Sequence, residues 1–198
     1  MRKAECIIFP DIHGRGFWKS ALSDDCEWYT DTYIFLGDFF DPYPREKISV
    51  PDAIRNFMQI QGAVKKLRDN GKTVVMLMGN HDAHYVNWLF DQRVGGVRKN
   101  RQYAERIREL LTENENFKHS IAYEMTVGGK KILFTHAGVT SAWYNEHKQL
   151  IGDLTADNLN RLTYTNGGWL SLCDVSWERG GYDLSGSCIY ADLNDHYN

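Results

Sequence analysis

The chain has 198 residues, of which 42% are hydrophobic and 25% are charged, and its net charge is −3 at pH 7. Such a composition is typical of a globular protein that is large enough to bury a core. No stretch gathers lysine and arginine on one face, so we expect no surface that binds nucleic-acid polymers by bulk charge. The first apolar run ends at Asp11 and no later run has transmembrane length. We therefore expect neither a signal peptide nor contact with a membrane.

The four cysteines stand far apart, and no two of them form a C-x-x-C pair. This spacing argues against a zinc knuckle and against a thioredoxin-like redox motif. Without a secretory signal, we expect the thiols to be reduced and the protein to be cytoplasmic.

Three continuous apolar runs predict buried strands at Cys6–Pro10, Tyr33–Leu36 and Thr73–Met78. Continuous rather than alternating runs are typical of parallel strands that are covered on both faces. Between the second and third runs, apolar residues recur at helical spacing from Pro51 to Asn70. A strand, a crossover helix and a strand make a βαβ unit, so we predict an α/β core.

The remainder of the chain gives weaker patterns. A helix is predicted over Arg101–Glu113, and two runs on either side of a Gly-Gly pair, Ile121–Val127 and Lys130–Thr135, predict a tight hairpin. A short helix is predicted over Asp157–Leu162, and loops with short strands are predicted from Tyr164 onward. No internal repeat or linker divides the chain, so residues 1–198 are expected to form one catalytic domain.

Polar side chains follow each of the buried runs and the second hairpin strand. The four clusters are Asp11-Ile12-His13-Gly14, Gly37-Asp38-Phe39-Phe40-Asp41, Gly79-Asn80-His81-Asp82 and Thr135-His136-Ala137-Gly138. Open α/β sheets place their ligand sites at the carboxyl ends of the strands. The recurrence of such clusters at four strand ends therefore predicts a common site.

The residue types in these clusters suit a pair of divalent metal ions. Asp11 and His13 are two positions apart in an extended segment, so both side chains point to one side. Asp38 offers two carboxylate oxygens and can bridge two cations, while Asn80 supplies an oxygen and His136 a nitrogen. Mixed nitrogen and oxygen ligands favour Mn, Fe or Zn over Ca. Two such ions can activate a bridging water as the nucleophile of a hydrolysis.

The series DIHG, GDFFD, GNHD and THAG resembles the signature of the calcineurin-like metallophosphoesterases. It is closest to the branch that contains the phosphoprotein phosphatases and the bis-nucleoside-tetraphosphatases, and the similarity runs from Glu5 to Val139. The resemblance implies an α/β fold in which two packed mixed β-sheets are flanked by helices, an α-β-β-α sandwich. It also implies metal-dependent hydrolysis of phosphate esters.

The resemblance further implies a role for each of the metal-capable residues. Asp11 and His13 are expected to hold the first ion, Asp38 to bridge, and Asn80 and His136 to hold the second.

By the same resemblance, His81 is a catalytic residue and not a metal ligand. It is expected to face the leaving-group oxygen and to pair with Asp41. An imidazole that a carboxylate stabilises can protonate a departing alkoxide, which is general acid catalysis. Asn80 is also expected to contact the substrate.

Two departures from the family pattern affect the expected site. Protein phosphatases continue the second motif with Asp-Arg-Gly, whose arginine grips phosphate, whereas here the run is Asp41-Pro42-Tyr43-Pro44-Arg45. Either Arg45 takes over that role or the phosphate is held otherwise. The family's second ion normally takes a further histidine from a later Gly-His segment. His196 is the candidate by position; the alternative is that the chain is truncated before that segment, which leaves the second metal site weak.

Arg179 is a further candidate for contact with phosphate. The run Trp177-Glu178-Arg179 resembles the Trp-x-Arg of bacterial protein phosphatases. A guanidinium suits bidentate binding of phosphate.

Three functions fit these observations. The first is a phosphomonoesterase that acts on a small phosphate ester or on a phosphorylated protein, for example at phosphoserine or phosphothreonine. The second is a nucleotide phosphodiesterase or dinucleoside-polyphosphate hydrolase. The third is a non-catalytic interaction module on the same fold, against which the intact clusters at the strand ends argue.

Overall fold

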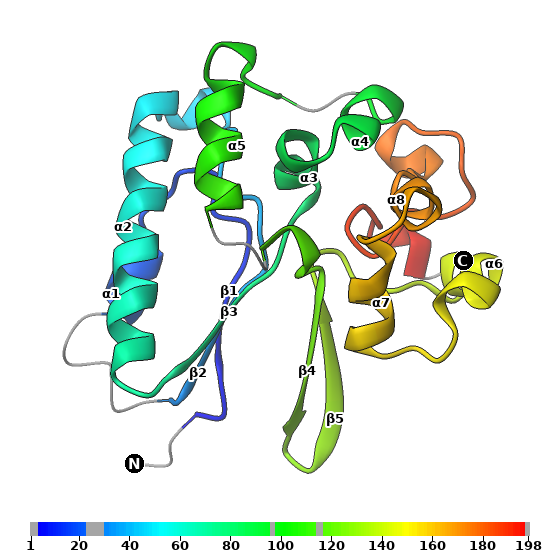
Figure 1. Cartoon of the computed structure of the whole chain (residues 1–198), viewed down its shortest axis with the longest axis horizontal. Coiled ribbons are helices and arrows are strands. Elements are labelled where there is room, and N and C mark those ends of the chain that lie inside the picture. Colours follow the sequence, from blue (N-terminus) through cyan, green and yellow to red (C-terminus); the bar gives the residue numbers. More distant parts are fainter. Residues whose placement is uncertain (1–3, 23–29, 96–97, 114–116, 197–198) are drawn as a thin grey trace.

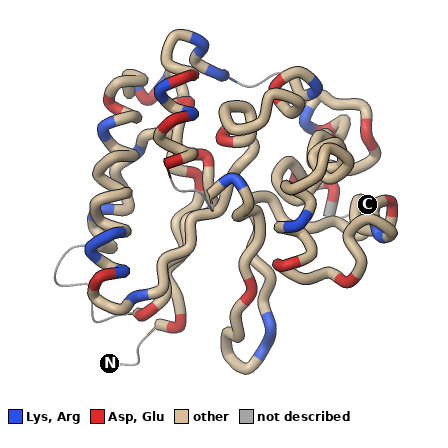
Figure 2. The backbone as a smooth tube through the Cα atoms, in the orientation of Figure 1, with Lys and Arg blue, Asp and Glu red and all other residues tan. Residues whose placement is uncertain are grey.

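The computed structural model describes residues 4–22, 30–95, 98–113 and 117–196. A small parallel sheet lies beside a hairpin, with helices on the outer side of each (Figure 1). Basic and acidic residues are both spread over the helices and the hairpin (Figure 2). No helix in the described ranges has the length and apolarity needed to cross a bilayer.

The parallel sheet contains the three strands expected from the apolar runs. They are β1 (Ile7–Phe9), β2 (Thr32–Phe35) and β3 (Thr73–Met76), hydrogen-bonded in the order β1-β2-β3. In this register Phe9 lies opposite Phe35, and their rings stack with centroids 4.4 Å apart. The predicted strands are therefore confirmed. β1 and β3 are each two residues shorter than their apolar runs, and β2 begins and ends one residue earlier than its run.

Helix α2 (Val50–Asp69) is the crossover between β2 and β3 and covers one face of the sheet (Figure 1). It begins at Ser49, whose hydroxyl oxygen accepts a hydrogen bond from the amide of Asp52 at 3.2 Å, a bond that satisfies one of the free amides of the first turn. Proline near the N-terminus suits this position because its fixed φ matches the helix. The apolar stripe of α2 is buried against the sheet, as its periodicity predicted.

The second sheet is the predicted hairpin of β4 (Ala122–Val127) and β5 (Lys130–Thr135), which pair antiparallel. Helix α7 (Ala156–Leu162) packs on β4, and Asn160 fixes it there, because its side-chain oxygen accepts from the amide of Ala122 at 2.9 Å. Helix α5 (Ala104–Thr112) confirms most of the other predicted helix. The α/β class with two sheets is thus confirmed; within the described residues one sheet is parallel and the other antiparallel.

The expectation of loops and short strands from Tyr164 onward is wrong at its start. Residues Asn166–Leu172 form helix α8, capped by Thr165, whose hydroxyl oxygen accepts from the amide of Gly168 at 3.0 Å. A Cβ at Gly168 would lie 2.0 Å from the carbonyl oxygen of Leu162. Close packing of α8 on α7 therefore uses the glycine that weakens the helical pattern in the sequence.

Several further elements complete the described part of the chain. The further α-helices are α1 (Trp18–Ala21), α3 (Asn80–Val86), α4 (Trp88–Arg93) and α6 (Ser141–Ile151). The 3₁₀ turns are η2 (Pro44–Glu46), η3 (Arg101–Tyr103), η4 (Phe117–His119), η5 (Trp177–Arg179) and η6 (Asn194–His196). Only Leu77, Met78 and Gly79 separate β3 from helix α3, so α3 carries the polar residues of the third cluster.

Candidate metal centre

The loops after β1 and β2 are held against each other by backbone hydrogen bonds that extend beyond the sheet. The amide of His13 donates to the carbonyl of Asp38 at 2.6 Å, and the amide of Gly14 donates to the carbonyl of Phe39 at 3.0 Å. His13, Asp38 and Asp41 all have positive φ, at 44°, 54° and 59°. Such conformations are unfavourable for non-glycine residues and cluster at functional sites.

Two glycines allow the chain to pass close behind the Asp38 carboxylate. Gly37 has φ +110°, and a Cβ there would lie 2.3 Å from the amide nitrogen of Gly79. A Cβ at Gly79 would lie 2.2 Å from Oδ1 of Asp38. Neither position has room for a side chain, so glycine is required at both for the ends of β2 and β3 to meet.

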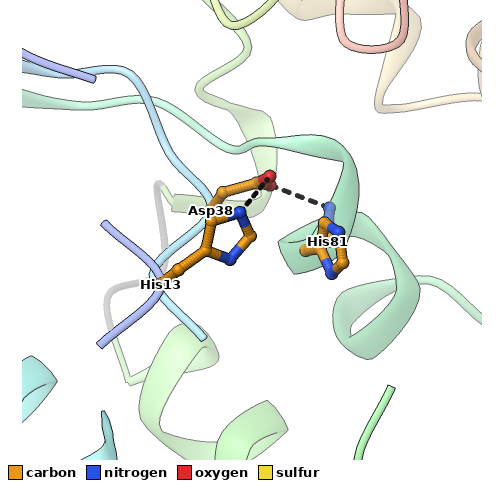
Figure 3. Close-up of side chains that lie close together, drawn as sticks. All are labelled: His13, Asp38 and His81. Atoms are coloured by element: carbon orange, nitrogen blue, oxygen red, sulfur yellow. Dashed lines mark hydrogen bonds and ion pairs between the residues drawn. The ribbon is translucent and has the colours of Figure 1, made fainter. Parts of the chain in front are cut away.

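Asp38 lies at the centre of the cluster and is buried. Its Oδ2 is 3.5 Å from Nε2 of His13 and 3.6 Å from Nε2 of His136, while its Oδ1 accepts a hydrogen bond from the amide of His81 at 2.9 Å. Figure 3 shows His13 and His81 on either side of this carboxylate. One carboxylate oxygen therefore faces two imidazole nitrogens that come from different sheets.

The hydrogen bonds of the two imidazoles direct their other nitrogens toward Asp38. Nδ1 of His13 lies 2.7 Å from the carbonyl oxygen of Phe40, and Nδ1 of His136 lies 2.8 Å from that of Leu36. A carbonyl oxygen can only accept, so Nδ1 carries the proton in both rings. Each Nε2 is left with a lone pair, the form in which histidine binds a metal ion.

Asn80 extends the same arrangement. Its side-chain oxygen Oδ1 lies 3.0 Å from Nε2 of His136. With the proton of His136 on Nδ1, both atoms are acceptors, and two acceptors this close repel each other unless they coordinate the same cation. The donor set around Asp38 therefore fits divalent metal ions.

Asp11 lies at the open edge of this group, with 47% of its side chain exposed, and its Oδ1 is 4.0 Å from Nδ1 of His136. Ligand atoms of Asp11, Asp38 and His136 lie within 4.8 Å of one another, and so do those of His13, Asp38 and His81. The structure thus brings together all of the ligands predicted at the four strand ends. The division of these ligands between two ions remains a prediction.

Next to this group, Asp41 joins two side chains of α3. Its Oδ2 lies 3.0 Å from Nδ1 of His81, and the hydroxyl of Tyr85 donates to its Oδ1 at 2.5 Å. His81 and Tyr85 are four residues apart, so they lie on one face of the helix. The expected pairing of His81 with Asp41 is present. Tyr85 was missed in the sequence, where its spacing from His81 was the available signal.

Asp82 is a second residue that the sequence reasoning missed. Its carboxylate is fully buried and accepts hydrogen bonds from the amides of Asp38 at 2.7 Å, Phe39 at 3.1 Å and Gly79 at 3.1 Å. Burial and the nearby Asp38 raise the pKa of Asp82, against the opposing effect of the three amides. Asp82 therefore fixes the backbone that carries Asp38.

Burial and charge act in opposite directions on the central groups. Burial raises the pKa of Asp38, but the imidazoles of His136, His81 and His13 outweigh it, so the pKa is lowered. Burial lowers the pKa of His13, although Asp38 opposes the shift. Both shifts favour the unprotonated forms that bind metal ions.

The remaining predicted site residues lie further out. Arg45 is exposed on η2, with its guanidinium 5.2 Å from the ring centroid of Tyr43. Arg179 forms an ion pair with Asp192, in which its Nε lies 3.2 Å from Oδ2 of the carboxylate. Tyr190 is a buried residue whose hydroxyl is hydrogen-bonded to the side chain of Asn80. Burial raises the pKa of Tyr190, and the positive charge of Arg179 opposes that rise.

Tyr190 had no signal in the sequence, because its segment comes to the site only through the fold. The amide of Ala137 donates to the carbonyl of Cys188 at 3.0 Å, which joins this segment to the turn after β5.

The backbone of His196 lies in η6, but its side chain lies outside the described part of the chain, so its role as a ligand stays a prediction.

Comparison with protein families agrees with this geometry. Residues 7–186 match the model of the calcineurin-like phosphoesterase family. The chain belongs to this family, whose members are phosphoester hydrolases that typically depend on divalent metal ions. Neither the curated proteins nor the solved structures include a significant match.

Proposed function

We propose that the protein hydrolyses phosphate monoesters with two divalent metal ions held by Asp11, His13, Asp38, Asn80 and His136. The observation that carries this proposal is the position of Asp38, whose Oδ2 faces Nε2 of His13 at 3.5 Å and Nε2 of His136 at 3.6 Å. Membership of the phosphoesterase family supports the reaction class. Mn, Fe or Zn suits the mixed nitrogen and oxygen ligands.

Bound ions would supply a water of lowered pKa and neutralise charge on the phosphate. The chain supplies the proton for the leaving group. Nδ1 of His81 is occupied by Asp41 at 3.0 Å, which leaves Nε2 to hold a proton and donate it to the departing alkoxide. Tyr85 holds the other oxygen of Asp41 and so limits rotation of the carboxylate.

Substrate contacts are proposed for Asn80, Arg45 and Arg179. Asn80 lies among the metal ligands and has a side-chain amide that can donate to phosphate. Arg45 and Arg179 lie further from the metal ligands than Asn80 does. A guanidinium there can bind the oxygens of a phosphate ester. The substrates that fit are small phosphate esters or phosphoserine and phosphothreonine in proteins.

A pair of aryl substrates tests the proposal directly. Protein reconstituted with Mn²⁺ should hydrolyse p-nitrophenyl phosphate faster than bis(p-nitrophenyl) phosphate. Faster turnover of the diester would favour the nucleotide phosphodiesterase function instead. Absence of turnover of both, with metal bound, would favour a non-catalytic module.

A further inference from the structure

Three arginines surround the ring of Tyr43, beside the candidate metal centre. The guanidinium carbon of Arg98 lies 3.9 Å from the ring centroid, that of Arg45 5.2 Å and that of Arg15 6.0 Å. Each contact is a cation–π attraction, in which the guanidinium lies over the negative face of the ring. Three cations around one ring also repel one another, and an anion bound between them removes that repulsion.

The positive charge of this group is only partly neutralised by the protein. Nε of Arg15 lies 3.7 Å from a carboxylate oxygen of Glu46 and donates to a backbone carbonyl, and Arg98 donates to the backbone carbonyl of Asp41 at 3.2 Å. In the described ranges of the chain, Arg45 makes no hydrogen bond or ion pair. Among the described residues, these three guanidinium groups have a single carboxylate partner, Glu46, so N–H donors remain for a ligand.

The Tyr43 ring also connects this group to the metal centre. Its ring meets the His13 ring edge to face, with centroids 4.9 Å apart, and the His13 ring lies 4.9 Å from that of His81. Arg98 donates a hydrogen bond to the backbone carbonyl of Asp41, and the carboxylate of Asp41 is paired with His81. A single aromatic ring therefore separates the arginines from a predicted metal ligand.

We propose that Arg15, Arg45 and Arg98 bind a second phosphate group of a small substrate whose first phosphate lies at the metal centre. The inference rests on the proposed function, and it narrows the substrate class to small esters that carry two phosphates. The planar fork of a guanidinium matches the oxygens of a phosphate. The two phosphate positions lie on either side of the Tyr43 ring. A short linker between two phosphates spans this separation, so a small molecule is favoured over a phosphoprotein. Tyr43 holds the arginines in position.

Calorimetry on the Mn²⁺-loaded protein tests this with two matched, non-hydrolysable probes, propylphosphonate and propane-1,3-bisphosphonate. The bisphosphonate should bind the wild type more tightly. Arg45→Gln should lower its affinity about tenfold, the size of one lost charge-assisted hydrogen bond, and should lower that of the monophosphonate much less. Arg98→Gln should also lower the affinity for the bisphosphonate. If Arg98→Gln fails to fold, Arg45→Gln alone still tests the proposal. The control is Arg106→Gln, which removes an exposed ion pair on α5.

The outcomes separate this proposal from the function on which it rests. Equal losses for both probes would place the arginines on the first phosphate and overturn the proposal, as would no loss for either. A peptide with two adjacent phosphoserines is the third probe; dependence on Arg45 for this peptide alone would also overturn the small-molecule assignment. Because the readout is binding, a protein that fails to hydrolyse aryl phosphate counts against the proposed function but leaves this test intact.

Discussion

Nδ1 of His81 lies 3.0 Å from Oδ2 of Asp41 in a buried pair at the start of α3. The pair fixes the orientation of the imidazole and leaves Nε2 as its free nitrogen. In the proposed mechanism Nε2 carries the proton that goes to a leaving group beside Asp38, so this contact is where the proposed acid chemistry and the metal centre meet.

We expect His81→Ala to keep its metal and to lose roughly 10²–10⁴-fold in turnover, the usual range for a lost general acid. The loss should shrink for substrates with activated leaving groups, such as nitrophenolates, which need no proton. Steady-state kinetics on aryl and alkyl phosphates measure the difference, and Asp41→Asn should give a milder form of it. His119→Ala, which removes a ring stacked on Tyr164, is the control. An equal loss on good and poor leaving groups would count against the acid role.

Tyr85→Phe should destabilise the protein by about 1–3 kcal/mol, because it removes the donor to a buried carboxylate oxygen. The amide of Asn100, which donates to the Tyr85 hydroxyl at 2.9 Å, loses its acceptor as well. Urea unfolding measures the change. Tyr164→Phe removes a hydroxyl from a ring that is 66% exposed, and should alter stability by less than about 0.5 kcal/mol. Similar effects in the two variants would show that the Tyr85–Asp41 bond contributes little.

Stability should fall as the pH drops from 6.5 toward 4, because burial lowers the pKa of His84 to about 4. In this window the unfolded chain binds a proton at His84 and the folded chain does not, so protonation favours unfolding. Above pH 6.5, His84 is neutral in both states and does not reduce the free energy of unfolding. As the pH falls to about 4, its protonation in the unfolded chain lowers the free energy of unfolding by about 3 kcal/mol. Urea titrations across this range should show a shallower slope for His84→Gln. An identical slope in variant and wild type would remove His84 as the cause.

Gly79→Ala should lose both metal binding and stability, because the new Cβ would lie 2.2 Å from Oδ1 of Asp38. The matched control is Gly62→Ala on the exposed side of α2, where nothing lies within 4 Å of the added Cβ. Alanine there should stabilise the helix by roughly 0.5–1 kcal/mol. Thermal melts with and without Mn²⁺ compare the two. Retention of metal by Gly79→Ala would mean that Asp38 is not confined as the structure indicates.

Local patterns in the sequence predicted the strands, α2, the hairpin and the polar clusters. These features depend on residues that are neighbours along the chain, and the carboxyl ends of parallel strands must meet. Asp82 and Tyr190 could not be predicted this way, since their partners Asp38 and Asn80 are distant in the sequence. Helix α8 was missed because its glycines weaken the helical pattern, while packing against α7 compensates.

Metal content measured by mass spectrometry, together with turnover of p-nitrophenyl phosphate, tests the bridging role of Asp38 most directly. Wild-type protein reconstituted with Mn²⁺ should fill one position tightly and a second only at high metal concentration, because the second set of ligands has little charge beyond the shared carboxylate. Asp38→Asn should weaken binding at both positions and remove turnover, whereas Asp69→Asn, which removes an exposed ion-pair carboxylate at the end of α2, should alter neither. Unchanged metal content in Asp38→Asn would contradict the assignment of Asp38 as the bridge.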